Sequence, residues 1–313
     1  MMKRKHKWTF TARFRSGAYG WRGSGLATRR LKESVTEVRK VARADPVIGA
    51  EGAVALMTRL WPALQDIDTS SGALGNAVYG ALERLIPLLV SAPADRNMRT
   101  KWLERLFVAM ENDGVQYLSP VEDRWGEICV FPILADEWAE RLLPIVREAW
   151  SGHSCFRFVT GDTACLSCLL ELGRYQELNE LLSLRSGPFW PIDRFGAEAL
   201  ARQGLTDAAI AYAEARRKDN YDDTRITEFC ERVLLDADRR DEIIDWIENR
   251  FGIEQTAMTG TVVTYRLRLA LRDVAKALGY PIPLVNEMTE KVPSGDAAEV
   301  REYRRQISQV LGE

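Results

Sequence analysis

The sequence predicts an all-α fold: helical-hairpin repeats of the α-solenoid kind, followed by a small C-terminal segment that is helical or α+β. Apolar residues recur at helical spacing along most of the chain. Glycines interrupt this pattern, so that residues 163–184 and 189–217 each read as a helix, a glycine turn and a second helix. Units of roughly 30–35 residues built in this way are typical of tetratricopeptide-like repeats.

Residues 25–150 are expected to form a helical bundle or armadillo-like region. The first helix of this region carries Leu31 and Val35 on one face. Asp45 before Pro46 predicts the start of the next helix, because Asp is a common N-cap and proline suits the first turn. The spacing predicts further helices over residues 46–65, 70–90, 94–113, 119–131 and 133–150.

Two more regions complete the predicted organisation, after a basic tail at residues 1–24. Residues 151–234 contain the tetratricopeptide-like hairpins. Residues 235–313 form a separate region, in which the pattern of residues is different. In this last region the pattern predicts helices at residues 239–252, 267–279 and 297–313, with a strand-like stretch at Thr261–Tyr265.

Composition narrows the class of protein. Hydrophobic residues make up 46% of the chain and charged residues 28%, as in ordinary soluble globular proteins. We expect no membrane span, because no run of 18 or more apolar residues occurs, and no secretory signal, because the N-terminus has no long apolar stretch. Five cysteines, an odd number, favour reduced thiols in the cytoplasm.

The N-terminal segment is strongly basic. From Met1 to Lys32 the chain contains no acidic residue, although its overall net charge is only −2. Basic residues with interleaved aromatic ones can bind phosphates and stack on bases. The alternative is a solvated tail that leads into the first helix and is pinned by Trp8 and Trp21. The candidate nucleic-acid residues here are Lys3, Arg4, Lys5, Lys7, Arg13 and Arg15.

A candidate zinc site consists of His153, Cys155, Cys165 and Cys168, which supply the four nitrogen and sulfur ligands that zinc needs. Their spacing matches no zinc-finger pattern, and Cys165 and Cys168 fall on the buried face of a predicted helix. The sequence therefore favours core packing over zinc. Because no phosphate-binding loop, dinucleotide fingerprint or nucleophile–histidine context is present either, we expect no cofactor and no catalytic residue.

Most of the chain, residues 1–234, resembles a group of uncharacterised proteobacterial helical-repeat proteins. The stretches FRSGAYGWRGS, KVARADPVIGAEGAVAL, DIDTSSGALGNAV and GPFWPIDRFGAEALARQG carry that resemblance. It implies a helical-repeat fold and no particular activity.

A second resemblance lies at residues 239–293, where RRDEII, TVVTYR and ALRDVAKALG occur in the order and spacing of the palm region of bacterial C-family DNA polymerases. This family comprises the polymerase III alpha subunits and their error-prone relatives, in which a preceding strand carries aspartates for two catalytic metal ions. Counted back from Asp241 without gaps, those aspartates fall at Cys230 and Arg232, and a third acidic position falls at Leu234. None of these side chains can replace a carboxylate.

Residues 223–235 moreover read as a helix rather than a strand. The nearby Asp236 and Asp238 are expected to sit at a helix start, where acids favour the helix dipole, rather than to bind metal. The resemblance implies shared ancestry or a domain fusion, without polymerisation. It adds Arg266, Arg268 and Arg272 as nucleic-acid candidates.

The sequence therefore leaves two kinds of function open. The first is a non-catalytic helical-repeat scaffold that binds a protein or peptide partner on an extended concave surface. The alternative is a DNA-associated protein related by fusion or descent to the bacterial polymerase alpha subunit, without polymerase activity. The sequence favours the first function, and it favours a protein that is not an enzyme.

Overall fold

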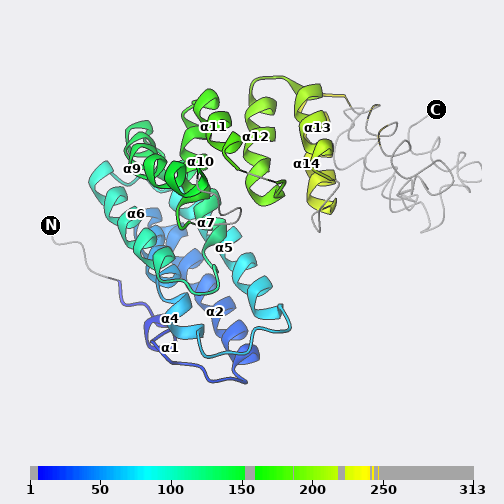
Figure 1. Cartoon of the computed structure of the whole chain (residues 1–313). Coiled ribbons are helices and arrows are strands. Elements are labelled where there is room, and N and C mark those ends of the chain that lie inside the picture. The colour runs from blue at the N-terminus through cyan, green and yellow to red at the C-terminus, as the bar shows by residue number, and fades with distance from the viewer. Residues whose placement is uncertain are drawn as a thin grey trace, which may run out of the picture. The chain divides into compact units, whose positions relative to one another are not determined.

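We describe a computed structural model of the chain over residues 6–151, 159–185, 187–217 and 223–239, with Glu242 and Trp246. These residues form helices and no strand, so the predicted all-α class is confirmed (Figure 1). The predicted strand-like stretch at Thr261–Tyr265 lies outside the described residues. The helices are α1 Phe10–Arg13, α2 Ser24–Ala44, α3 Pro46–Met57, α4 Leu60–Leu64, α5 Ala73–Ser91, α6 Arg96–Glu111, α7 Ser119–Asp123, α8 Trp125–Cys129, α9 Pro132–Ser151, α10 Asp162–Glu171, α11 Tyr175–Ser183, α12 Trp190–Arg202, α13 Thr206–Ala215 and α14 Asp223–Asp236.

Several helix boundaries are set by local chemistry. The Asp45 side chain accepts a hydrogen bond from the backbone N–H of Ile48 (3.0 Å) and Pro46 occupies the first turn, which confirms the predicted start of α3. Asp95 caps α6 in the same way, through the N–H of Met98 (2.8 Å).

Two predicted helices are each interrupted. The predicted helix at residues 46–65 ends at Met57 and resumes as α4, and the one at residues 119–131 is divided into α7 and α8 at Arg124. The apolar spacing of the sequence predicts neither of these two breaks.

The glycine turns of the predicted hairpins are present. Gly173 (φ 69°) lies between α10 and α11, and Gly204 (φ 74°) between α12 and α13, both in the left-handed conformation that glycine adopts without strain. Helix α12 packs against α13, and α13 packs against α14 (Figure 1). The assignment of these hairpins to the tetratricopeptide class remains a prediction.

Aromatic side chains join the helices of the core. Trp125 on α8 meets Trp138 on α9 edge to face (5.1 Å between ring centroids), and Phe107 on α6 lies 4.8 Å from Trp138. Aromatic pairs of this kind stabilise the fold by more than the burial of their surface area alone. They join α6, α8 and α9 in one hydrophobic core.

The N-terminal segment is partly a component of this core. Trp8 is 8% exposed, and its ring lies so close to Gly52 on α3 that an added Cβ there would be 2.1 Å from it. Trp21 is 68% exposed. Trp8 thus pins the segment as expected, whereas the prediction that Trp21 does so is wrong.

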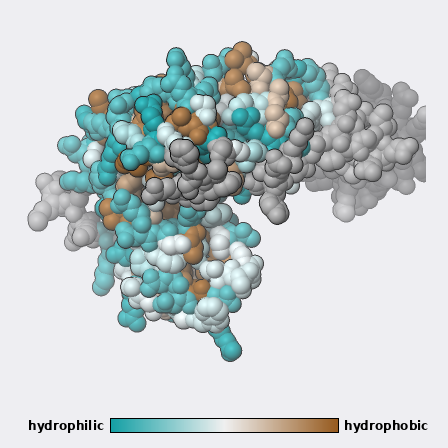
Figure 2. Space-filling view, in the orientation of Figure 1, coloured by the Kyte–Doolittle hydropathy of each residue, from teal (hydrophilic) through white to brown (hydrophobic). Residues whose placement is uncertain are grey.

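Among the described helices, α5 alone is long and apolar enough to meet the length and composition of a membrane span. Its apolar face, which includes Val78, Leu82 and Leu85, is buried, and α5 packs against α2 and α3. Burial of this kind is ordinary for a core helix. In the view of Figure 2, hydrophilic side chains cover most of the described surface, with apolar ones scattered between them.

By its internal contacts the chain divides into Met1–Ile243 and Ile244–Glu313. Helices α1 to α14 all belong to the first unit. The predicted four-region organisation remains a prediction.

Candidate functional site

Within the described part of the N-terminal basic segment, residues Thr9 and Arg13 contact α2. The backbone N–H and hydroxyl of Thr9 donate to the Glu37 carboxylate (2.8 and 2.5 Å), and Arg13 pairs with Glu33. Glu33 and Glu37 are the only acids of α2, so both are engaged by this segment.

The predicted nucleic-acid residues are therefore not equivalent. Lys7 and Arg15 are exposed, while Arg13 is half-buried in its ion pair with Glu33. Lys3, Arg4 and Lys5 lie outside the described residues, as do Arg266, Arg268 and Arg272. The exposed cations of this region can meet phosphate, because charge attraction of this kind needs no pocket.

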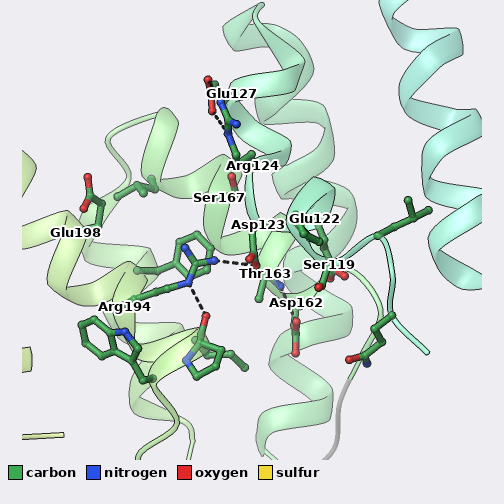
Figure 3. A pocket seen from close by; sticks show the side chains of 18 of the residues that line it. Ser119, Glu122, Asp123, Arg124, Glu127, Asp162, Thr163, Ser167, Arg194 and Glu198 are labelled. Atoms are coloured by element: carbon green, nitrogen blue, oxygen red, sulfur yellow. Dashed lines mark hydrogen bonds and ion pairs between the residues drawn. The ribbon is translucent and has the colours of Figure 1, made fainter. Parts of the chain in front are cut away.

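A cleft of about 920 Å³ opens between α7, α10, α12 and α14 (Figure 3). It is rich in carboxylates, with ten against five arginines, and it has aromatic side chains on its walls. Several arginines are already paired, as in Arg124–Glu127 (2.6 Å), Arg202–Glu171 (2.7 Å) and Arg232–Glu198 (2.5 Å). The excess of acid makes the cleft suited to a cationic ligand.

Three carboxylates gather at one end of the cleft, where Figure 3 shows them near Arg194. Glu122 on α7 accepts a hydrogen bond from the N–H of Gly161 (2.6 Å), and Asp162 at the start of α10 accepts one from Thr163 (2.6 Å). Asp123 pairs with Arg194 (2.8 Å). Helix α7 thus brings two adjacent acids against the first residue of α10.

Burial changes the protonation of this group. Burial, with the nearby charge of Asp162 adding to it, raises the pKa of Glu122 to about 8. Burial likewise raises the pKa of Asp162 to about 6, and it raises the pKa of Asp123 against the opposing charge of Arg194. At neutral pH Glu122 therefore carries a proton, and a cation placed beside it would favour its release.

The candidate zinc ligands are only partly within the described residues. Cys165 and Cys168 are fully buried on α10, and Cys168 lies beside Cys129. Burial raises the pKa of the Cys165 thiol to about 12, as for a cysteine packed in a hydrophobic core. His153 and Cys155 lie outside the described residues, so the four-ligand site stays a prediction.

Across residues 6–151, 159–185, 187–217 and 223–239, no group of three or more His, Cys, Asp or Glu side chains is arranged to hold a metal ion.

The positions to which ungapped counting from Asp241 assigns the polymerase metal aspartates do not fit a metal. They lie on α14, the predicted helix at this place in the chain. Cys230 and Leu234 are buried, and Arg232 pairs with Glu198 (2.5 Å) and Asp236 (3.2 Å). A buried thiol, an aliphatic chain and a guanidinium supply no hard anionic oxygen for Mg²⁺.

One expectation about this region is wrong. The sequence predicts Asp236 at a helix start, but it is the last residue of α14, where it pairs with Arg232 at the preceding turn. Asp238 comes after the helix with φ 56°. The i, i+4 pair with Arg232 explains the carboxylate at Asp236 without a metal.

Comparison with known proteins places one similarity in the C-terminal part. Residues 233–311 match a family model described as bacterial DNA polymerase III alpha NTPase domain. The match begins after Cys230 and Arg232, so it does not include those positions. No solved structure matches the chain.

The similar relatives are error-prone DNA polymerases. That of Saccharophagus degradans is 43% identical over 60 residues, 19% of this chain and 6% of that protein. That of Ralstonia nicotianae is 28% identical over 134 residues, 37% of this chain and 12% of that protein. The chain thus spans only about a tenth or less of the length of these relatives.

Together these observations define an all-α protein with a basic N-terminal surface and an acidic cleft. Its C-terminal segment is similar to part of the bacterial polymerase III alpha subunit. The basic segment and the polymerase-like segment are recognisable in the sequence. The cleft is not, because Glu122 and Asp162 are 40 residues apart and neither stands in a recognisable motif.

Proposed function

We propose that this chain is a DNA-associated protein that does not polymerise nucleotides and that acts in the cytoplasm. The match of residues 233–311 to the polymerase III alpha family model carries this proposal. The exposed Lys7 and Arg15 of the N-terminal segment support it, because cations of this kind attract the phosphates of DNA.

The absence of polymerisation is argued from residue chemistry. Phosphoryl transfer by two metal ions requires carboxylates that bring the primer hydroxyl and the triphosphate together. Ungapped counting places Cys230 and Arg232 at those positions on α14, where Cys230 is buried and the exposed Arg232 pairs with Glu198. DNA would thus be a binding partner rather than a substrate.

The test is the salt dependence of DNA binding. Removing Met1–Arg15 is unsuitable because Trp8, Phe10 and Phe14 are buried in the core. We therefore choose a variant with Gln at each of four basic positions: Lys3, Arg4, Lys5 and Lys7. Each phosphate contact contributes close to one unit of log–log slope, so the slope should flatten by about 2 to 4 units.

A control variant, Arg84→Gln/Lys101→Gln/Arg147→Gln, neutralises three exposed cations elsewhere on the molecule, on α5, α6 and α9. This control should keep the slope of the wild-type protein within one unit. Binding that is tight and equally salt-dependent in the N-terminal variant would contradict a role for this segment. The C-terminal arginines Arg266, Arg268 and Arg272 would then be the next candidates.

The acidic cleft favours a second function, a helical scaffold for a protein or peptide partner. Its ten carboxylates, five arginines and aromatic walls suit a cationic peptide segment. Competition separates the two functions, because DNA would not displace a peptide from a cleft of this charge.

A further inference from the structure

We propose that the outer face of α2 is a docking surface for single-stranded DNA, and this inference rests on the proposed association with DNA. The surface consists of five exposed cations, hereafter the α2 stripe: Arg29, Lys32, Arg39, Lys40 and Arg43. The exposed Trp21, which precedes α2 by three residues, is the proposed stacking partner for a base.

The α2 stripe is a single face of the helix. With 100° per residue, its five cations fall within an arc of about 100°. Ala27, Leu31 and Val38 lie on the opposite, buried face. From Arg29 to Arg43 the stripe extends about 21 Å along the axis, which spans about six phosphates of one strand at the spacing of duplex DNA.

This face differs from an ordinary solvated helix surface, in which acids and bases alternate and pair. The two acids of α2 lie toward one edge and are engaged by the N-terminal segment: Glu33 pairs with Arg13, and Glu37 accepts hydrogen bonds from Thr9. Glu33 also lies 4.0 Å from Arg29.

The remaining stripe cations lack such compensation. Within the part of the chain that the structure describes, Lys32, Arg39, Lys40 and Arg43 have no carboxylate partner. The stripe therefore presents unneutralised positive charge in a row, which is complementary to a phosphate backbone.

Trp21 favours single-stranded over duplex DNA as the ligand of this surface. Its side chain is 68% exposed, while its backbone carbonyl accepts a hydrogen bond from the N–H of Asp68 (3.0 Å). The loop is thus fastened while the ring stays in solvent. Exposed aromatic rings stack on unpaired bases, whereas the bases of a duplex already stack on each other.

The experiment measures anisotropy of a fluorescein-labelled oligothymidylate with the full chain, over a range of salt concentrations. The variant Arg39→Gln/Lys40→Gln/Arg43→Gln removes three stripe cations, and Arg84→Gln/Lys101→Gln/Arg147→Gln removes as many from other helices. We expect the stripe variant to bind at least tenfold more weakly near 0.1 M salt and to lower the log–log slope by about 2 units. The control should stay within about twofold of wild type. All six positions are exposed, and unchanged thermal midpoints will verify folding.

Trp21→Ala isolates the stacking contribution. We expect about tenfold weaker binding to oligothymidylate, no change in binding to a blunt duplex, and loss of tryptophan quenching on titration. Equal loss for strand and duplex, or none for either, would overturn the assignment to single strands.

The remaining outcomes are also decisive. If wild type binds the oligonucleotide and the stripe variant binds equally well, the α2 surface is wrong while DNA association stands. If wild type binds neither strand nor duplex, both proposals fail. If the stripe variant loses binding to vesicles of phosphatidylserine and phosphatidylcholine but not to DNA, the surface is a membrane-binding one, and the proposal is overturned.

Discussion

Replacing Arg99 with Met is expected to lower the free energy of unfolding by about 4 kcal/mol. The Arg99 side chain is fully buried on α6, and its guanidinium donates to the backbone carbonyls of Leu89 (2.8 Å), Ala92 (2.8 Å) and Ile128 (2.9 Å). These carbonyls lie at the C-terminal ends of α5 and α8, where helix geometry leaves carbonyls without partners. A cation at this place also complements both helix dipoles.

Urea unfolding of the wild-type and variant proteins measures the effect. Arg96→Met is the matched control, because Arg96 lies on the same helix in an exposed ion pair with Glu137, and its loss should cost less than about 1 kcal/mol. Arg99→Lys keeps the charge but can donate fewer hydrogen bonds. Its free energy of unfolding should therefore fall between those of the Arg99→Met and Arg96→Met variants. An Arg99→Met protein within about 1 kcal/mol of wild type would show that the three carbonyls need no donor.

The second large effect concerns pH. The pKa of Glu122 is raised in the folded protein to about 8, against an ordinary value of 4.5. The folded state therefore favours the protonated carboxyl. The stability that this gives is fully present below about pH 4.5 and is lost as pH rises through about 8.

Glu122→Gln stays neutral and keeps an acceptor for the N–H of Gly161. Between pH 5 and pH 9 wild type should lose about 3 kcal/mol more stability than this variant, given about 1.4 kcal/mol per pKa unit and the overlapping titration of Asp162. Urea midpoints at the two pH values provide the measurement. Glu111→Gln, an exposed carboxylate of the same cleft, should behave as wild type does. Parallel pH profiles for wild type and Glu122→Gln would refute the account of this carboxyl.

Local signals predicted the helices well. The Asp45-Pro46 start, the glycine turns and the helix at α14 all depend on residues within a few positions of each other, and each is present. Side-chain patterns over such short distances report directly on backbone conformation.

Contacts between residues far apart in the chain could not be predicted from the sequence. Glu51 on α3 accepts hydrogen bonds from Trp102 (2.5 Å) and Arg105 (2.5 Å) on α6, more than 50 positions away. The burial of Arg99 and the meeting of Glu122 with Asp162 arise in the same way. Each depends on the three-dimensional arrangement of helices and leaves no spacing to detect in one sequence.

The polymerase-like segment is recognisable from its own residues, and residues 233–311 match the corresponding family model. The proposed lack of polymerase activity depends on α14, where ungapped counting places Cys230 and Arg232 at the metal positions. Their burial and pairing in a helix explain why those residues are there without reference to catalysis.

Incubation of the full chain with a labelled primer–template, Mg²⁺ and all four deoxynucleoside triphosphates tests the central claim most directly. A native gel reports the complex, and a denaturing gel of the same reaction reports primer length. We expect a salt-sensitive complex with the primer unextended, because Cys230 and Arg232 stand where ungapped counting from Asp241 places the metal-binding carboxylates. Template-directed extension of the primer, or the lack of any complex at low salt, would contradict it.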